Sequence, residues 1–84
     1  MNTKPTKRES EHLAAVKALP CSVCDKPGPS AAHHIKQDQP YLCVALCFEC
    51  HQGREGIHGT KAIWRVYKMD ELDALATTFR RLLA

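Results

Sequence analysis

The cysteines form two pairs with the spacing of a metal clamp. One C-x-x-C pair consists of Cys21 and Cys24, and the other of Cys47 and Cys50. Two residues between paired thiolates let both sulfurs reach one ion at about 2.3 Å, and four thiolates complete a closed tetrahedral zinc site. The intervening residues 25–46 leave room for a β-hairpin. Because a single redox pair would leave the other pair unexplained, we predict a structural Zn²⁺ bound by all four cysteines.

A site closed by four thiolates has no open coordination position, so it stabilises a fold without performing chemistry. The fifth cysteine, Cys43, lies in the apolar segment YLCVAL, residues 41–46. We expect a buried free thiol there, and the alternative is that Cys43 replaces one of the four ligands. Any catalysis must therefore come from other residues.

Four histidines would gather around such a clamp. His33 and His34 are adjacent on an expected strand, so their rings should point to opposite faces. His51 directly follows the second cysteine pair, and His58 comes shortly after it. Each ring alone has an ordinary structural explanation, as a hydrogen-bonded side chain or a loop residue. Together they predict a second centre, because imidazole is both a common transition-metal ligand and the usual general base near neutral pH.

The segments that position these residues predict a small α+β fold. We expect residues 1–8 to form a disordered basic arm and residues 9–84 to form one domain. The arm carries Lys4, Lys7 and Arg8, which are either solvated charges or contacts to phosphates.

Apolar periodicity and turn-forming residues define the predicted elements. They are a helix over residues 9–19 with Ser10 as its N-cap, paired strands over residues 31–35 and 41–46, and helices over residues 60–68 and 70–83. In the last helix an apolar stripe should face the core, formed by Leu72, Leu75, Ala76, Phe79, Leu82 and Leu83. Trp64 and Tyr67 are expected in the core, with base stacking as the alternative.

Length and composition exclude some classes of protein. The chain has 84 residues and a formal net charge of +3, and a chain this short usually needs a metal or disulfides to fold. The polar start MNTKPTKRESEH does not resemble a signal peptide, and no apolar run reaches the roughly 18 residues of a membrane helix. We therefore expect a reducing cytosol, where cysteine pairs bind metal more often than they form disulfides.

Three short segments carry a resemblance to a known family: AHHI at residues 32–35, LCFECH at residues 46–51 and GIHG at residues 56–59. They resemble the zinc-stapled branch of the HNH nucleases, whose core is a β-hairpin and a helix around one metal, the ββα-metal fold. Over residues 19–84 the chain is similar to small phage nucleases of the Ref (recombination enhancement function) group, which depend on RecA filaments. The resemblance implies a metal-dependent DNA endonuclease of phage or prophage origin in the bacterial host cytosol. Its partners would be DNA and a RecA-type recombinase filament.

The same resemblance implies a role for each histidine. His34 would be the general base that activates water, and His33, His51 and His58 would bind a catalytic Mg²⁺ or Mn²⁺. Glycines between and after the last two histidines would let the chain turn tightly.

One position departs from the family pattern. The asparagine that braces the base in the family would fall near Tyr41 or Leu42. A backbone carbonyl or Gln39 would then have to orient His34.

Two functions stay open on the sequence alone. The first is the HNH endonuclease, for which Arg54, Lys61 and Arg65 would bind phosphates. The alternative for these three residues is an ordinary solvated charge. The second function is a non-catalytic zinc-stapled module that binds DNA or a protein, and such a module needs no second metal.

Overall fold

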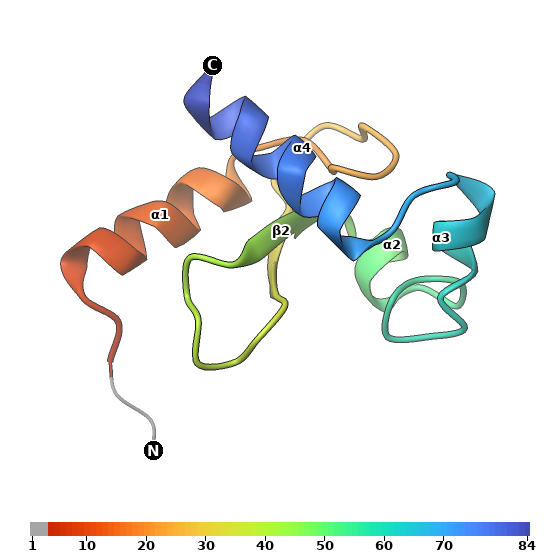
Figure 1. Ribbon diagram of the computed structural model, residues 1–84, viewed down its shortest axis with the longest axis horizontal. Helices are drawn as coiled ribbons and strands as arrows, with labels where there is room; N and C mark the ends of the chain where they lie inside the picture. Colours follow the sequence, from red (N-terminus) through yellow and green to blue (C-terminus); the bar gives the residue numbers. More distant parts are fainter. Residues whose placement is uncertain (1–3) are drawn as a thin grey trace.

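The computed structural model describes residues 4–84, shown in Figure 1. Within this range, four helices accompany one two-stranded antiparallel sheet, which confirms the predicted α+β class. In chain order the elements are α1 (Lys7–Lys17), β1 (Ala31–His34), β2 (Cys43–Leu46), α2 (Phe48–Gln52), α3 (Ala62–Val66) and α4 (Glu71–Leu83). Figure 1 shows α1 at one side, α2 and α3 at the other, and α4 crossing the sheet between them. None of the helices in the described range is long and apolar enough to cross a membrane.

The first helix begins inside the segment predicted to be a disordered arm. Thr6 is its N-cap: the Thr6 hydroxyl accepts a hydrogen bond from the Glu9 amide, and the Glu9 carboxylate accepts one from the Thr6 amide. This reciprocal capping box satisfies two amides at the helix start. Lys7 and Arg8 therefore belong to α1, and the predicted boundary at residue 9 and the predicted cap at Ser10 are wrong. Residues 1–3 of the predicted arm lie outside the described range.

The sheet is the predicted hairpin with shorter strands. Both are four residues long, and β2 begins at Cys43, two residues later than predicted. His33 pairs with Val44, and His34 pairs with Cys43. Residues directly opposite each other in an antiparallel pair share a face, and neighbours along a strand alternate. The two adjacent histidines therefore lie on opposite faces of the sheet, as predicted.

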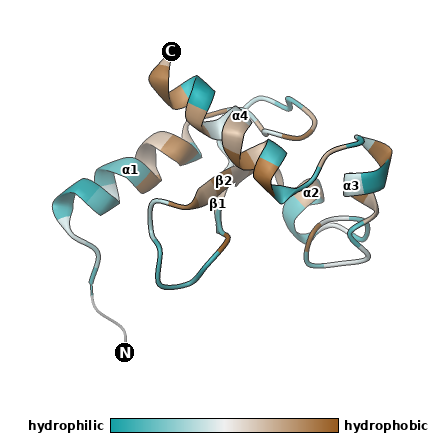
Figure 2. Cartoon of the chain, in the orientation of Figure 1, coloured by the Kyte–Doolittle hydropathy of each residue, from teal (hydrophilic) through white to brown (hydrophobic). Residues whose placement is uncertain are grey.

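Each face of the sheet packs into its own hydrophobic cluster. On one face Cys43 and Ala45 pack with Val16 of α1. On the other face Val44 and Leu46 pack with the cysteine pairs and with side chains from α3 and α4. All of β2 is buried, and Figure 2 shows β2 in the hydrophobic colours, with a mainly hydrophilic loop joining the two strands. The second face is the one that carries His33.

Helix α4 closes the outer edge of β2 with a buried threonine. The Thr78 hydroxyl donates to the Ala74 carbonyl at 3.0 Å, accepts from the Ala45 amide at 3.3 Å and lies 2.7 Å from the Ser22 hydroxyl. The Ser22 amide also donates to the Ala45 carbonyl. An edge strand that would otherwise expose unpaired backbone groups is thus covered by α4 and by the first cysteine pair's loop.

The predicted apolar stripe of α4 is partly wrong. Three of its members are exposed: Leu72, Ala76 and Leu83. The fully buried positions are instead Ala74 and Thr78, while Leu75 and Leu82 pack against the clusters. The helix is rotated because the Thr78 hydroxyl satisfies backbone and side-chain groups that an apolar residue would leave without partners.

The short helices also differ from the prediction. α2, which carries Cys50 and His51, was not predicted as a helix from the sequence. α3 is shorter than the predicted segment 60–68, and Lys61 precedes it in the left-handed region with φ of 65°.

Candidate metal centres

The two cysteine pairs meet where the sheet joins α2. Cys21, Cys47 and Cys50 are buried, and Cys24 is partly exposed. The four sulfurs all lie within 4.8 Å of one another, and the sulfurs of Cys24 and Cys47 are 3.6 Å apart. Sulfurs at about 2.3 Å from one tetrahedral ion are separated by roughly 3.8 Å. The four cysteines could therefore hold a structural metal ion such as zinc, while Cys43 is a buried thiol outside the group.

The pKa values of these thiols are consistent with a cation between the four sulfurs. Burial works to raise the pKa of Cys21, but backbone hydrogen bonds to Cys24, Cys47 and Val23, together with a side-chain hydrogen bond to Cys24, lower it overall. Burial and the nearby charge of Cys21 raise the pKa of Cys50. One thiolate therefore disfavours the next one, and four thiolates side by side need a positive ion between them.

Three of the predicted histidines converge at a second place. Nδ1 of His33 lies 3.3 Å from Nε2 of His51, and Nε2 of His58 lies 3.1 Å from the same atom. The rings meet at interplanar angles of 60–69°, so they point nitrogens at one another instead of stacking. Imidazole nitrogens bound to one ion at about 2.1 Å are separated by roughly 3.0–3.4 Å. The spacing fits three ligands of a single divalent ion.

Backbone contacts return His58 to His51. The His58 amide donates to the His51 carbonyl at 3.0 Å, and the Ile57 amide donates to the Cys50 carbonyl at 2.9 Å. At Gly56 the chain passes so close that a Cβ would lie 2.7 Å from the Cys50 carbonyl oxygen. A glycine was expected here so that the chain could turn tightly, and this is confirmed. The requirement comes from the close approach of the backbone, because the φ of Gly56 is not positive.

A carboxylate that sequence reasoning did not assign braces the histidine cluster. Nε2 of His33 lies 3.2 Å from Oε2 of Glu71, the first residue of α4. The Asp70 and Asp73 side chains form a capping box that fixes this first turn. In sequence the only signal was a carboxylate in the first turn of a predicted helix, because 38 residues separate Glu71 from His33.

The electrostatics keep two rings of the cluster neutral. Burial is the main cause that lowers the pKa of His33; the Glu71 carboxylate opposes it, and with the added effect of His58 and His34 the pKa is lowered overall. Burial also lowers the pKa of His51, with added repulsion from His33 and His58. Neutral imidazole is the form that binds metal ions.

His34, the predicted general base, is not a member of the three-histidine group. It is half-buried and ends β1, on the sheet face that carries Cys43. Its ring is nevertheless close enough to His33 to affect the pKa of that neighbour.

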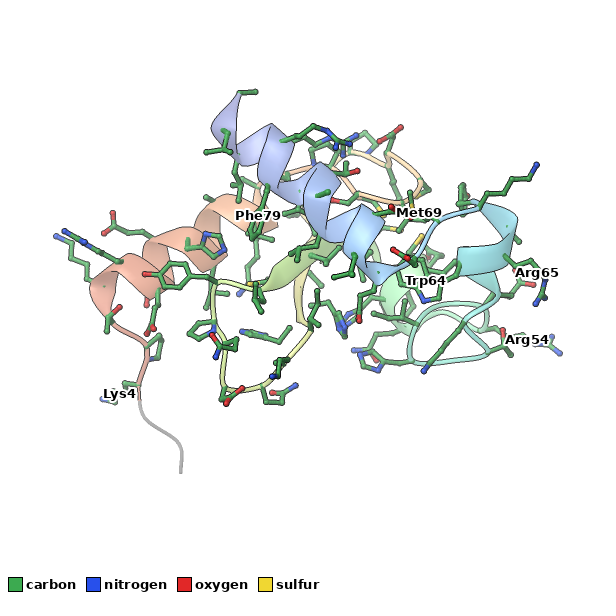
Figure 3. The ribbon with its side chains drawn as sticks, viewed as in Figure 1. Lys4, Arg54, Trp64, Arg65, Met69 and Phe79 are labelled. Atoms are coloured by element: carbon green, nitrogen blue, oxygen red, sulfur yellow. The ribbon has the colours of Figure 1, made fainter. Side chains whose placement is uncertain are left out.

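The residues predicted to bind phosphate separate into two places. Lys61 lines a cavity of about 240 Å³ together with His33, His58, Trp64 and Glu71. Arg54 and Arg65 line a different cavity of about 910 Å³ beside the cysteine pairs, and Figure 3 shows both at one outer edge of the molecule. Trp64 packs against the core as expected, whereas Tyr67 is 45% exposed, which contradicts its predicted core position.

Comparison with known proteins does not assign a family to this chain. No protein-family model matches the chain, and no curated protein or solved structure matches it. The residues themselves present a four-cysteine group and a three-histidine group, each with the spacing of metal ligands.

Proposed function

We propose that this protein is a metal-dependent DNA endonuclease with the ββα-metal core of the HNH family. In this proposal the four cysteines hold a structural Zn²⁺ and the three clustered histidines hold a catalytic Mg²⁺ or Mn²⁺. The observation that carries the proposal is that nitrogens of His33 and His58 lie 3.3 Å and 3.1 Å from Nε2 of His51, beside an open cavity.

The two groups differ in what they leave open. The cysteine group supplies four ligands and so completes a tetrahedral site. The histidine group supplies three, and His58 is exposed, so substrate and water can reach the remaining positions. A purely structural protein needs no such second group. Because imidazole favours transition-metal ions over Mg²⁺, we expect Mn²⁺ to support more activity than Mg²⁺.

The proposed reaction is hydrolysis of a phosphodiester. A bound divalent ion supplies charge stabilisation for the phosphate and for the departing 3′ oxygen. His34 accepts the proton of the attacking water as general base. His34 lies on the sheet face opposite to His33. In this proposal the phosphodiester therefore lies across the end of β1, where both histidines can reach it. The Lys61 ammonium, in the same cavity as His33, binds a phosphate oxygen.

The proposal includes the setting that the resemblance implies. The protein would be of phage or prophage origin and would act in the bacterial host cytosol on DNA held by a RecA-type filament. Of the three basic residues predicted to bind phosphate, only Lys61 lines the histidine cavity. Binding to naked DNA should therefore be weak and should fall steeply with salt.

The second candidate is a non-catalytic zinc-stapled module that binds DNA or a protein partner. Two observations favour it: His34 lies outside the histidine cluster, and Tyr41 and Leu42 occur where the family has asparagine.

Plasmid cleavage by the zinc-loaded protein with Mn²⁺ or Mg²⁺ tests the proposal. His34→Ala should slow cleavage by about 10²–10⁴-fold, the usual contribution of a general base. His12→Ala is the matched control, because His12 lies on α1 and contacts the Tyr41 carbonyl instead. If naked DNA is not cut, DNA coated with RecA is the second substrate. DNA binding without cleavage of either substrate would support the binding module.

A further inference from the structure

We propose that Glu71 is a positioning residue for the histidine centre: it holds the proton of His33 on Nε2 and so leaves Nδ1 free to bind the metal. This inference rests on the metal centre of the proposed function. It adds a residue from α4 to a site built otherwise from β1, α2 and the loop after α2.

Both ring nitrogens of His33 have a defined neighbour. Nε2 faces Oε2 of Glu71 at 3.2 Å, and Nδ1 faces Nε2 of His51 at 3.3 Å. A neutral imidazole carries one proton, and an ionised carboxylate can only accept a hydrogen bond. The proton must therefore lie on Nε2, which leaves the lone pair of Nδ1 directed at the cluster.

Glu71 acts through His33 and not as a ligand itself. The carboxylate contacts the ring nitrogen that points away from His51, so the His33 ring lies between it and the cluster. Among the described residues, the convergent ligand atoms belong to His33, His51 and His58. A carboxylate in this place orients a histidine ligand and increases its basicity, and removal of such a partner typically costs 10–100-fold in metal affinity.

The position of Glu71 is fixed from both ends of α4. At the first turn, the Asp70–Asp73 capping box holds the backbone of Glu71. Near the other end, Arg81 donates to the Cys21 carbonyl at 3.2 Å and pairs with Asp25. One rigid helix thus connects the first cysteine pair to the histidine centre. The side chain of His33 is only 13% exposed, so its contact with Glu71 is shielded from water on the ring side.

Binding of Mn²⁺ alone to the full, zinc-loaded chain tests the inference without any activity assay. Mn²⁺ competes poorly for thiolates, so it leaves the structural zinc in place. Loss of the free-ion electron paramagnetic resonance signal reports binding. Glu71→Ala should weaken binding by about 10–100-fold. Glu71→Gln should weaken it less, because the amide oxygen still accepts from Nε2–H. Glu11→Ala, an exposed carboxylate on α1, is the charge-matched control and should bind as wild type does.

The tautomer of His33 gives a second test that needs no variant to fold. Long-range ¹H–¹⁵N correlation spectra of the wild-type, Mn²⁺-free protein should show the proton on Nε2. A proton on Nδ1 would overturn the inference. In Glu71→Ala the preference should be lost.

The outcomes separate the two levels of the proposal. If wild type binds no Mn²⁺, the metal centre of the proposed function fails, and this inference fails with it. If wild type binds Mn²⁺ and Glu71→Ala binds it equally tightly, the role of Glu71 fails while the metal centre stands. Weaker binding by Glu71→Ala, with zinc content and helix content unchanged, supports the role.

Discussion

Nδ1 of His33 lies 3.3 Å from Nε2 of His51, although 18 residues separate them in the sequence. β1 carries one ring, and α2 carries the other directly after Cys50. The segment that presents a cysteine to the first group therefore also presents a histidine to the second. Under the proposed function, folding of α2 around a structural metal ion would also align His51 as a ligand of the histidine centre.

Removing one cysteine of the cluster should remove the metal and most of the fold. Structural zinc contributes of order 10–16 kcal/mol in small zinc-dependent folds, which exceeds the usual stability of a small domain. Cys50→Ala should therefore lose its zinc, measured by atomic absorption, and most of its helical circular dichroism. Cys43→Ala is the matched control and should keep one zinc per chain. A Cys50→Ala protein with full zinc and a cooperative thermal transition would contradict the cluster.

The Cys43 thiol should make stability depend on alkaline pH. Burial raises its pKa above that of an unfolded cysteine, so the folded chain holds this proton more tightly. Stability from the buried thiol is present below the unfolded pKa and is lost as pH rises toward the folded pKa. Urea midpoints of the zinc-loaded protein should therefore fall between about pH 7 and pH 10, bracketing the ordinary cysteine value. The fall should be smaller in Cys43→Ala. An equal fall in both proteins would show that the Cys43 thiol does not cause the pH dependence.

Thr78 should be sensitive to loss of its hydroxyl. Thr78→Val keeps the shape but leaves the Ser22 hydroxyl and the Ala45 amide without their partner. An unpaired buried polar group costs about 1–3 kcal/mol, so the free energy of unfolding should fall by that amount. Thr77→Val is the control, because the Thr77 hydroxyl donates to the Asp73 carbonyl of the same helix at an exposed position. Equal losses in the two variants, measured by urea unfolding, would show that the buried junction has no special role.

The two cavities allow a sharp test of DNA contacts. Lys61 lines the histidine cavity, whereas Arg54 lines the other one. Lys61→Ala should weaken DNA binding and reduce the slope of its salt dependence by about one. Arg54→Ala removes the same charge, and it should change both quantities much less. Fluorescence anisotropy with short duplexes at several salt concentrations measures both, and a larger effect of Arg54→Ala would reverse the assignment.

The cysteine group was predictable because the spacing of the two pairs restricts it. Two C-x-x-C pairs can place four sulfurs around one ion with little regard to the rest of the chain. The three histidines were assigned by resemblance, and the structure brings their nitrogens together. The hairpin followed from a segment rich in β-forming residues after a polar loop, and it was correct to within two residues at its ends.

Long-range partners could not be read from the sequence. The contact between Glu71 and His33 depends on how α4 crosses the sheet, and no local pattern encodes that crossing. The buried face of α4 was predicted incorrectly for a related reason. Threonine is usually a polar surface residue, and only the contacts of Thr78 with Ser22 and Ala45 on other elements show that it is buried. The start of α1 was missed because Ser10 was taken as the N-cap. The helix begins earlier, where Thr6 and Glu9 form a reciprocal capping box.

The central claim is that His33, His51 and His58 hold the ion that cuts DNA. The most direct test compares Mn²⁺-dependent plasmid cleavage by wild type and by His58→Ala at equal zinc content. His58 is exposed, so its removal should leave the fold intact. The account predicts that wild type nicks or linearises the plasmid and that His58→Ala loses most of this activity. Equal cleavage by both proteins, or no cleavage by wild type on naked and RecA-coated DNA, would contradict it.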